Sequence, residues 1–138
     1  MENQKEQELM IKLSMYEQQI KQIHQQLQAV EQAIIDIASI DSGLDELKGS
    51  KDQELLAPIG RGIFVKTKLI SENLIVDIGD KNFVTKDIDS TKKIIKEQME
   101  KLEKAREQLE KILEEINEEM TKSYIEHQKN HQDEKNSD

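Results

Sequence analysis

One apolar seam near the start of the chain constrains the fold more than any other feature. Large apolar residues recur at alternating spacings of four and three, a heptad pattern that lasts for about four repeats. Gln, Glu and Lys, which favour helices, fill the positions between them. The seam weakens only where Asp41 takes a core position and Gly43 follows, so it predicts a coiled-coil helix over residues 5–47. Its members are Leu9, Leu13, Tyr16, Ile20, Ile23, Leu27, Val30, Ile34 and Ile37.

A second, poorer seam occupies the last third of the chain. Apolar residues seven apart (Ile88, Ile95, Leu102, Leu109, Ile116) alternate with the weaker core positions Thr91, Gln98, Ala105 and Ile112. Asp87 precedes this seam, where its carboxylate can cap the first turn, and Asp89 adds charge that the helix dipole favours. We therefore expect a second coiled-coil helix over residues 87–126. Beyond Ile116 the core register holds Glu119 and Ser123, and residues 127–138 are expected to form a disordered tail.

The composition and the position of the structure breakers decide how the two helices are used. Only 35% of the 138 residues are hydrophobic and 3% are aromatic, which is little for a compact globule of this length. All five glycines and the single proline, Pro58, lie between Gly43 and Gly79. Because the two flanks are similar in length and the centre can turn the chain, we expect them to pair antiparallel, with both chain ends together. The predicted fold class is mostly α with small β: a long antiparallel coiled-coil hairpin.

The centre, residues 54–86, changes from helical to strand periodicity. Short apolar runs rich in β-branched residues are separated by the turn signals Gly60-Arg61-Gly62, Ser71-Glu72-Asn73 and Gly79-Asp80. This pattern predicts four strands in two hairpins. Isolated hairpins are marginal in water, so we expect the segment to complete its sheet with other subunits. The residues expected to mediate oligomerisation are Ile59, Ile63, Phe64, Val65, Leu74, Val76, Ile78, Phe83 and Val84.

The motifs of this centre resemble those of a known family. Residues 56–65 (LAPIGRGIFV), 74–79 (LIVDIG) and 83–86 (FVTK), between two heptad helices, are similar to the core of the alpha-type subunit of archaeal-type (GimC) prefoldin. The resemblance implies one prefoldin-type domain over residues 1–138 and a hexamer of two alpha and four beta subunits joined through an inter-subunit β-barrel. It also implies an ATP-independent chaperone that holds unfolded polypeptides at its coiled-coil tips. Such chaperones deliver them to a cytosolic group II chaperonin.

A holding function requires apolar side chains near the chain ends. Flexible, polarizable methionines suit contacts with unlike apolar surfaces, and antiparallel pairing brings the two ends of the chain together. The alternative is that these residues only widen the seam or pack where its register slips. The candidate client-binding residues are Met10, Ile11, Leu13, Met15, Tyr16, Met120, Tyr124 and Ile125, of which Met10, Ile11, Met15, Met120, Tyr124 and Ile125 are expected to face away from the partner helix.

Other function classes find little support in the sequence. The absence of cysteine excludes thiol chemistry, and a net charge of -9 disfavours nucleic acid as a partner. No apolar run approaches the roughly 18 residues of a membrane span, so we expect a cytoplasmic protein. His127 and His131 are four apart, but we interpret them as solvated rather than metal-binding, and we expect neither a cofactor nor catalysis. The remaining rival is a structural or adaptor coiled coil that never binds clients.

Overall fold

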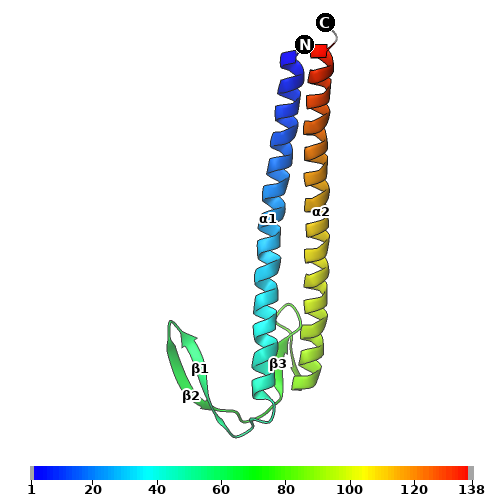
Figure 1. Cartoon of the computed structure of the whole chain (residues 1–138). Helices are drawn as coiled ribbons and strands as arrows, with labels where there is room; N and C mark the ends of the chain where they lie inside the picture. The colour runs from blue at the N-terminus through cyan, green and yellow to red at the C-terminus, as the bar shows by residue number, and fades with distance from the viewer. Residues whose placement is uncertain (1, 137–138) are drawn as a thin grey trace. The chain divides into compact units, whose positions relative to one another are not determined.

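The structure is a computed structural model that describes residues 2–136 (Figure 1). Helix α1 (Glu2–Leu47) is followed by strands β1 (Glu54–Gly60), β2 (Ile63–Lys68), β3 (Leu74–Asp77) and β4 (Phe83–Lys86), and then by helix α2 (Ile88–Asn136). The chain divides into two compact units. Unit 1 comprises Met1–Gln32 and Glu103–Asp138, and unit 2 comprises Ala33–Leu102. The mostly helical fold with two small hairpins confirms the predicted fold class.

The seam predicted for α1 is the face that the helix buries. Each of its nine members is half-buried or buried, and so are Asp41 and Leu44, which continue its spacing. Ile23 and Leu44 are the most protected, with 8% and 7% of their surface exposed. The helix ends at Leu47 because Gly49, with a φ of 78°, turns the backbone into a conformation that helices do not continue. The predicted end of the first helix is thus confirmed.

The seam of α2 differs from its prediction at two of the four weaker core positions, Gln98 and Ile112. Ile88 and Thr91 are buried, but Gln98 and Ile112 are exposed, whereas the next residues, Met99 and Leu113, are half-buried. Seam residues can be spaced by three residues and then four, or by four and then three, and both patterns repeat every seven residues. Packing selects the one that turns Met99 rather than Gln98 toward α1. The same phase continues through half-buried Met120, Ser123 and His127. Met120 therefore does not face away from α1, contrary to the prediction.

Helix α2 also continues beyond its predicted end. It runs to Asn136, whereas the sequence predicted a disordered tail from residue 127. The added segment contains neither Gly nor Pro, and half of its residues are Gln, Lys or Glu, which have high helix propensity. An exposed helix can therefore continue there without an apolar face.

The first hairpin pairs β1 with β2 around a tight turn. The register places Ala57 opposite Val65 and Pro58 opposite Phe64, with an irregularity between Pro58 and Gly60. Arg61 and Gly62 have φ values of 49° and 80°, the combination that two-residue hairpin turns require. Every residue of β2 is exposed. In β1 only Leu55 and Ala57 are half-buried, so most of this hairpin is exposed.

The second hairpin pairs β3 with β4 and has one protected face. Val76 lies opposite Val84 and Leu74 opposite Lys86, and these four side chains are half-buried. The opposite face is exposed, with Ile75 at 77% and Phe83 at 63%. Two separate two-stranded sheets result, so each hairpin leaves an exposed face.

Candidate functional site

Five large apolar side chains in unit 1 form what we call the tip surface. Met10, Ile11 and Met15 on α1 are 70%, 63% and 57% exposed, and Tyr124 and Ile125 on α2 are 50% and 47% exposed. Their positions in α1 and α2 lie toward the end of unit 1 where α1 begins and α2 ends (Figure 1). The predicted outward orientation holds for these five residues.

The other three candidate client-binding residues lie in the seam. Leu13, Tyr16 and Met120 are half-buried. Lys12 lies above the Tyr16 ring, with its Nζ 6.0 Å from the ring centroid, a distance at which a cation and an aromatic face attract each other. These three side chains become available only where α1 and α2 separate.

Small grooves mark the line where α1 meets α2 in unit 1. One of about 260 Å³ is bordered by Leu9 and Lys12 on α1 and by Ser123 and His127 on α2. A second, of about 320 Å³, is bordered by Tyr16 and again by Ser123. The short Ser123 side chain borders both grooves, which are open to solvent and lined mostly by polar side chains.

A larger open groove, of about 740 Å³, runs along α2 alone. Leu113 and Ile125 provide apolar surface within it, and its border carries carboxylates. Ile125 belongs both to this groove and to the tip surface, so the apolar surface extends along α2 toward the middle of the helix. The carboxylates at its border are Glu110, Glu114, Glu118 and Glu126.

The hairpins carry a second exposed apolar surface, in unit 2. Of the predicted oligomerisation residues, Ile59, Ile63, Phe64, Val65, Ile78 and Phe83 are exposed, whereas Leu74, Val76 and Val84 are half-buried on the protected face of the second hairpin. The prediction missed Leu56, Ile70 and Ile75, which are 63%, 82% and 77% exposed. Strand alternation would have identified Ile75, because it points to the face opposite Leu74 and Val76.

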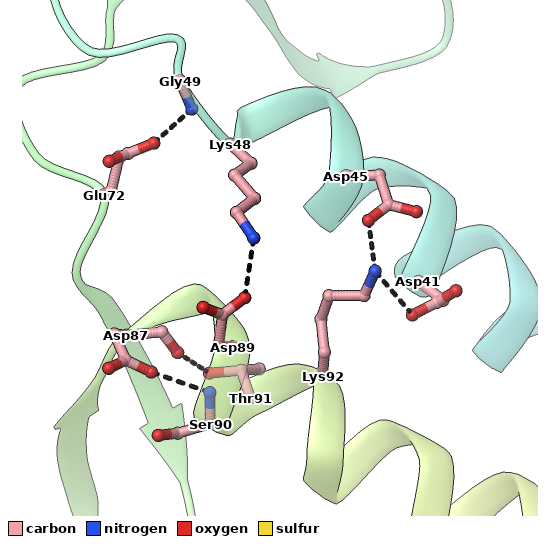
Figure 2. Close-up of polar contacts among 10 residues, drawn as sticks. All are labelled: Asp41, Asp45, Lys48, Gly49, Glu72, Asp87, Asp89, Ser90, Thr91 and Lys92. Atoms are coloured by element: carbon pink, nitrogen blue, oxygen red, sulfur yellow. Dashed lines mark hydrogen bonds and ion pairs between the residues drawn. The ribbon is translucent and has the colours of Figure 1, made fainter.

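Ion pairs join α1 to α2 within unit 2 (Figure 2). Lys92 Nζ contacts Asp45 and lies 3.8 Å from Asp41 Oδ1, while Lys48 Nζ donates to Asp89 Oδ1 over 3.0 Å. The hydrogen bond to Asp45 raises the pKa of Lys92, and the charge of Asp41 acts in the same direction. Sequence reasoning missed these pairs because their members are 41 to 51 residues apart.

The first turn of α2 is capped as predicted. The Asp87 carboxylate accepts a hydrogen bond from the Ser90 backbone N–H over 2.7 Å, and the Asp87 carbonyl accepts from the Thr91 hydroxyl over 2.8 Å (Figure 2). The Ser90 backbone N–H lowers the pKa of Asp87, with smaller contributions from the Ser90 side chain and the charge of Lys93. Just after the end of α1, the Gly49 N–H donates to the carboxylate of Glu72, which lies between β2 and β3. These bonds fix where each helix meets the strand segment.

Chemistry other than binding has no support among the described residues. No group of three or more His, Cys, Asp or Glu side chains there could hold a metal ion. His24 is exposed and His127 is half-buried, while the side chain of His131 lies outside the described part. Among the residues that the structure describes, neither helix combines the length and apolarity that a bilayer crossing requires.

Comparison with known proteins gives consistent matches. A family model described as Prefoldin subunit matches residues 16–133. The prefoldin subunit alpha of Methanobrevibacter smithii is 34% identical over 101 residues, which are 72% of this chain and 69% of that protein. The prefoldin subunit alpha of Methanosphaera stadtmanae is 28% identical over 94 residues, or 68% of each chain.

A solved structure shares the fold. It is described as the cryo-EM structure of filamentous PFD from Methanocaldococcus jannaschii, and it matches with a TM-score of 0.73 at 20% sequence identity. The match covers 83% of this chain and 97% of that one.

Paired heptad helices joined by two small hairpins define a coiled-coil subunit with exposed apolar side chains on its helices and on its strands. The chain belongs to the prefoldin family, as its central motifs predicted. Members of this family are subunits of oligomeric chaperone complexes, not enzymes. The relatives named above from Methanobrevibacter smithii and Methanosphaera stadtmanae are both alpha subunits.

Proposed function

We propose that this chain is the alpha-type subunit of an ATP-independent holdase that binds unfolded polypeptides at the tip surface. The observation that carries the proposal is the gathering of five exposed large apolar side chains at one end of unit 1. Unfolded polypeptides expose apolar side chains that a surface of this kind can cover. Burial of each large apolar side chain contributes about 1.5–3 kcal/mol, so the interaction needs no nucleotide.

The chemistry of the tip surface suits clients without a common sequence. Met10 and Met15 are unbranched and can adapt to apolar groups of different shape. The open groove along α2 adds Leu113 and Ile125. Its four glutamates outnumber its two lysines, Lys122 and Lys129, and so favour client segments that carry Lys or Arg beside apolar residues. The tip surface of one subunit can make only a few contacts with a client. Tips from several subunits that bind one client together would raise its affinity far above that of a single tip.

The same proposal assigns assembly to the hairpins. Their exposed apolar side chains and unpaired strand edges support an inter-subunit β-barrel formed with beta-type prefoldin subunits, in a hexamer of two alpha and four beta chains. Delivery of clients to a group II chaperonin in the cytoplasm rests on the family relationship alone. The whole chain would then act as one prefoldin-type domain.

The test is suppression of aggregation by the complex of this chain with a beta-type subunit, without ATP. A denatured test protein is diluted into buffer and its light scattering is followed. A variant with Met10→Ser, Ile11→Ser, Tyr124→Ser and Ile125→Ser should require several-fold more complex for the same suppression. Met120 is left unchanged because it is half-buried in the seam.

The matched control is Ile35→Ser with Ile40→Ser. These side chains are 61% and 47% exposed on α1 but belong to unit 2, so the control should suppress aggregation like the unaltered complex. A complex that never slows aggregation would contradict the holdase function and favour the adaptor coiled coil. Equal loss in the tip variant and the control would show that client binding is not located at the tip surface.

A further inference from the structure

The apolar seams do not determine how far α1 and α2 are displaced along each other. On α2 the residues Ile88, Ile95, Leu102, Leu109 and Ile116 are seven apart, and the α1 seam repeats with the same period. A slip of seven residues, which is about 10 Å at about 1.5 Å per residue, exchanges one large apolar side chain for another. The strands between the helices are connected by loops and need not prevent such a slip. Another feature must select the observed register.

Charged side chains near the end of α1 and the start of α2, which we call the base of the helix pair, supply that selection. Lys92 on α2 lies between Asp41 and Asp45, which are one turn apart on α1, and Lys48 pairs with Asp89 (Figure 2). The Lys92 side chain is 31% exposed and that of Asp41 is 46% exposed, although Asp41 holds a seam position. The contact of Lys92 with Asp41 therefore lies beside the seam, whereas the Lys48 and Asp89 side chains, 61% and 70% exposed, pair further toward solvent.

The order of the charges along α1 distinguishes the observed register from the registers displaced by seven residues in either direction. Asp41 and Lys48 are seven residues apart and opposite in sign. A slip of seven residues in one direction moves Lys92 from the aspartates to the level of Lys48. A slip in the other direction moves Asp89 from Lys48 to the level of Asp41. Each slip therefore replaces an attraction with a repulsion between like charges.

We propose that Asp41, Asp45, Lys48, Asp89 and Lys92 act as a register key, which selects one alignment of α1 and α2. The key contributes specificity more than stability, because exposed ion pairs are individually weak. A polar residue in a coiled-coil core position has the same effect, since it lowers stability and disfavours other registers. Asp41 is such a residue.

Selection of the register has consequences within unit 1. Leu9 and Ser123 border one groove there, and Tyr16 and Glu119 border another. A slipped α2 would displace its tip residues from those of α1 by about 10 Å. The inference concerns alignment of the helices and does not depend on whether the tip surface binds clients.

The test exchanges the two charges of α1 in the variant Asp41→Lys with Lys48→Asp, which leaves composition and net charge unchanged. Spin labels at Ser14→Cys and Glu107→Cys report the register, because both positions are exposed and the chain has no other cysteine. Counted from the level of Tyr16 and Glu119, the labels are separated by about 20 Å along the helices, at about 1.5 Å per residue. Dilution of the labelled full chain with unlabelled chain suppresses distances between molecules.

The labelled chain with its original charges should give one narrow distribution of distances between the two labels by pulsed electron spin resonance. The exchanged variant should give a second or displaced distance, longer or shorter by up to about 10 Å. Adding Asp45→Lys, Asp89→Lys and Lys92→Asp restores opposite charges in the original register and should restore the original distance. The control Glu97→Lys with Lys104→Glu exchanges exposed charges that are also seven apart, and it should change nothing.

Two results would overturn the register key. One is an unchanged narrow distance in the exchanged variant. The other is failure of the five-substitution variant to recover the original distance, which also covers the case in which the exchanged variant does not fold.

Discussion

The helix pair of unit 2 and that of unit 1 have the same heptad spacing but different residues in the seam. In unit 2, Leu44, Ile88 and Thr91 are buried, and ion pairs of Lys48 and Lys92 lie beside them. In the outer part of unit 1, the seam residues Leu9 and Tyr16 are only half-buried, and the facing side of α2 contains Ser123 and half-buried Met120.

The difference shows that one repeat can serve two physical purposes. Buried aliphatic groups with matched charges define a single arrangement, which suits a base from which the hairpins extend. A seam of half-buried residues flanked by exposed methionines leaves apolar surface on the outside of the helices, which suits contact with variable partners. The contrast can be tested region by region.

The largest expected effect concerns the hairpins of unit 2. Phe64 and Phe83 are 56% and 63% exposed, and their burial between subunits would contribute about 1.5–3 kcal/mol each. Phe64→Ser with Phe83→Ser should therefore weaken assembly with a beta-type subunit by about 100-fold or more. Native mass spectrometry over a concentration series measures the complex. Met10→Ser with Ile11→Ser, the same kind of change in unit 1, should leave assembly intact, and equal losses would remove the division of roles.

The next effect compares the two seams directly. Leu44→Ala removes a buried side chain in unit 2 and should lower the free energy of unfolding by about 2–4 kcal/mol. Leu13→Ala makes the same truncation at a half-buried position in unit 1 and should cost about half as much. Urea unfolding followed by circular dichroism measures both. A Leu13→Ala loss as large as that of Leu44→Ala would mean that the unit 1 seam is as well packed as the base.

The same contrast explains which elements could be predicted from sequence. In α1 the alternating spacings of four and three continue without a break from Leu9 to Ile37, so its seam and its end at Leu47 were predicted correctly. In α2 the pairs Gln98 with Met99 and Ile112 with Leu113 fit either phase. Only packing against α1 selects Met99 and Leu113.

The candidate site was predicted less completely, for related reasons. The outward orientation of Met10, Ile11 and Met15 followed from the heptad of α1, whereas Met120 was misplaced together with the α2 phase. The strand runs were located, but counting apolar residues without strict alternation missed Ile75. The ion pairs of Lys92 required the register between helices, and the register is a tertiary property that a single helix pattern does not contain.

The smallest expected effect concerns the first turn of α2, at the base. Asp87→Ala removes the acceptor that caps the Ser90 N–H and should lower the thermal midpoint at pH 7, but by less than Leu44→Ala does. Asp87→Asn keeps a side-chain oxygen acceptor without its charge. The comparison of the parent chain with Asp87→Asn therefore isolates the effect of the carboxylate.

This effect has a defined pH dependence. The Ser90 N–H lowers the pKa of Asp87 in the folded chain below the value of about 3.9 expected when unfolded. A lowered pKa means that the carboxylate stabilises the fold above about pH 4 and loses this contribution as the pH falls through the folded-state pKa. The midpoint of the parent chain should therefore exceed that of Asp87→Asn at pH 7, and the difference should shrink at about pH 2. A difference that stays constant over this range would mean that the cap acts through its geometry and not through its charge.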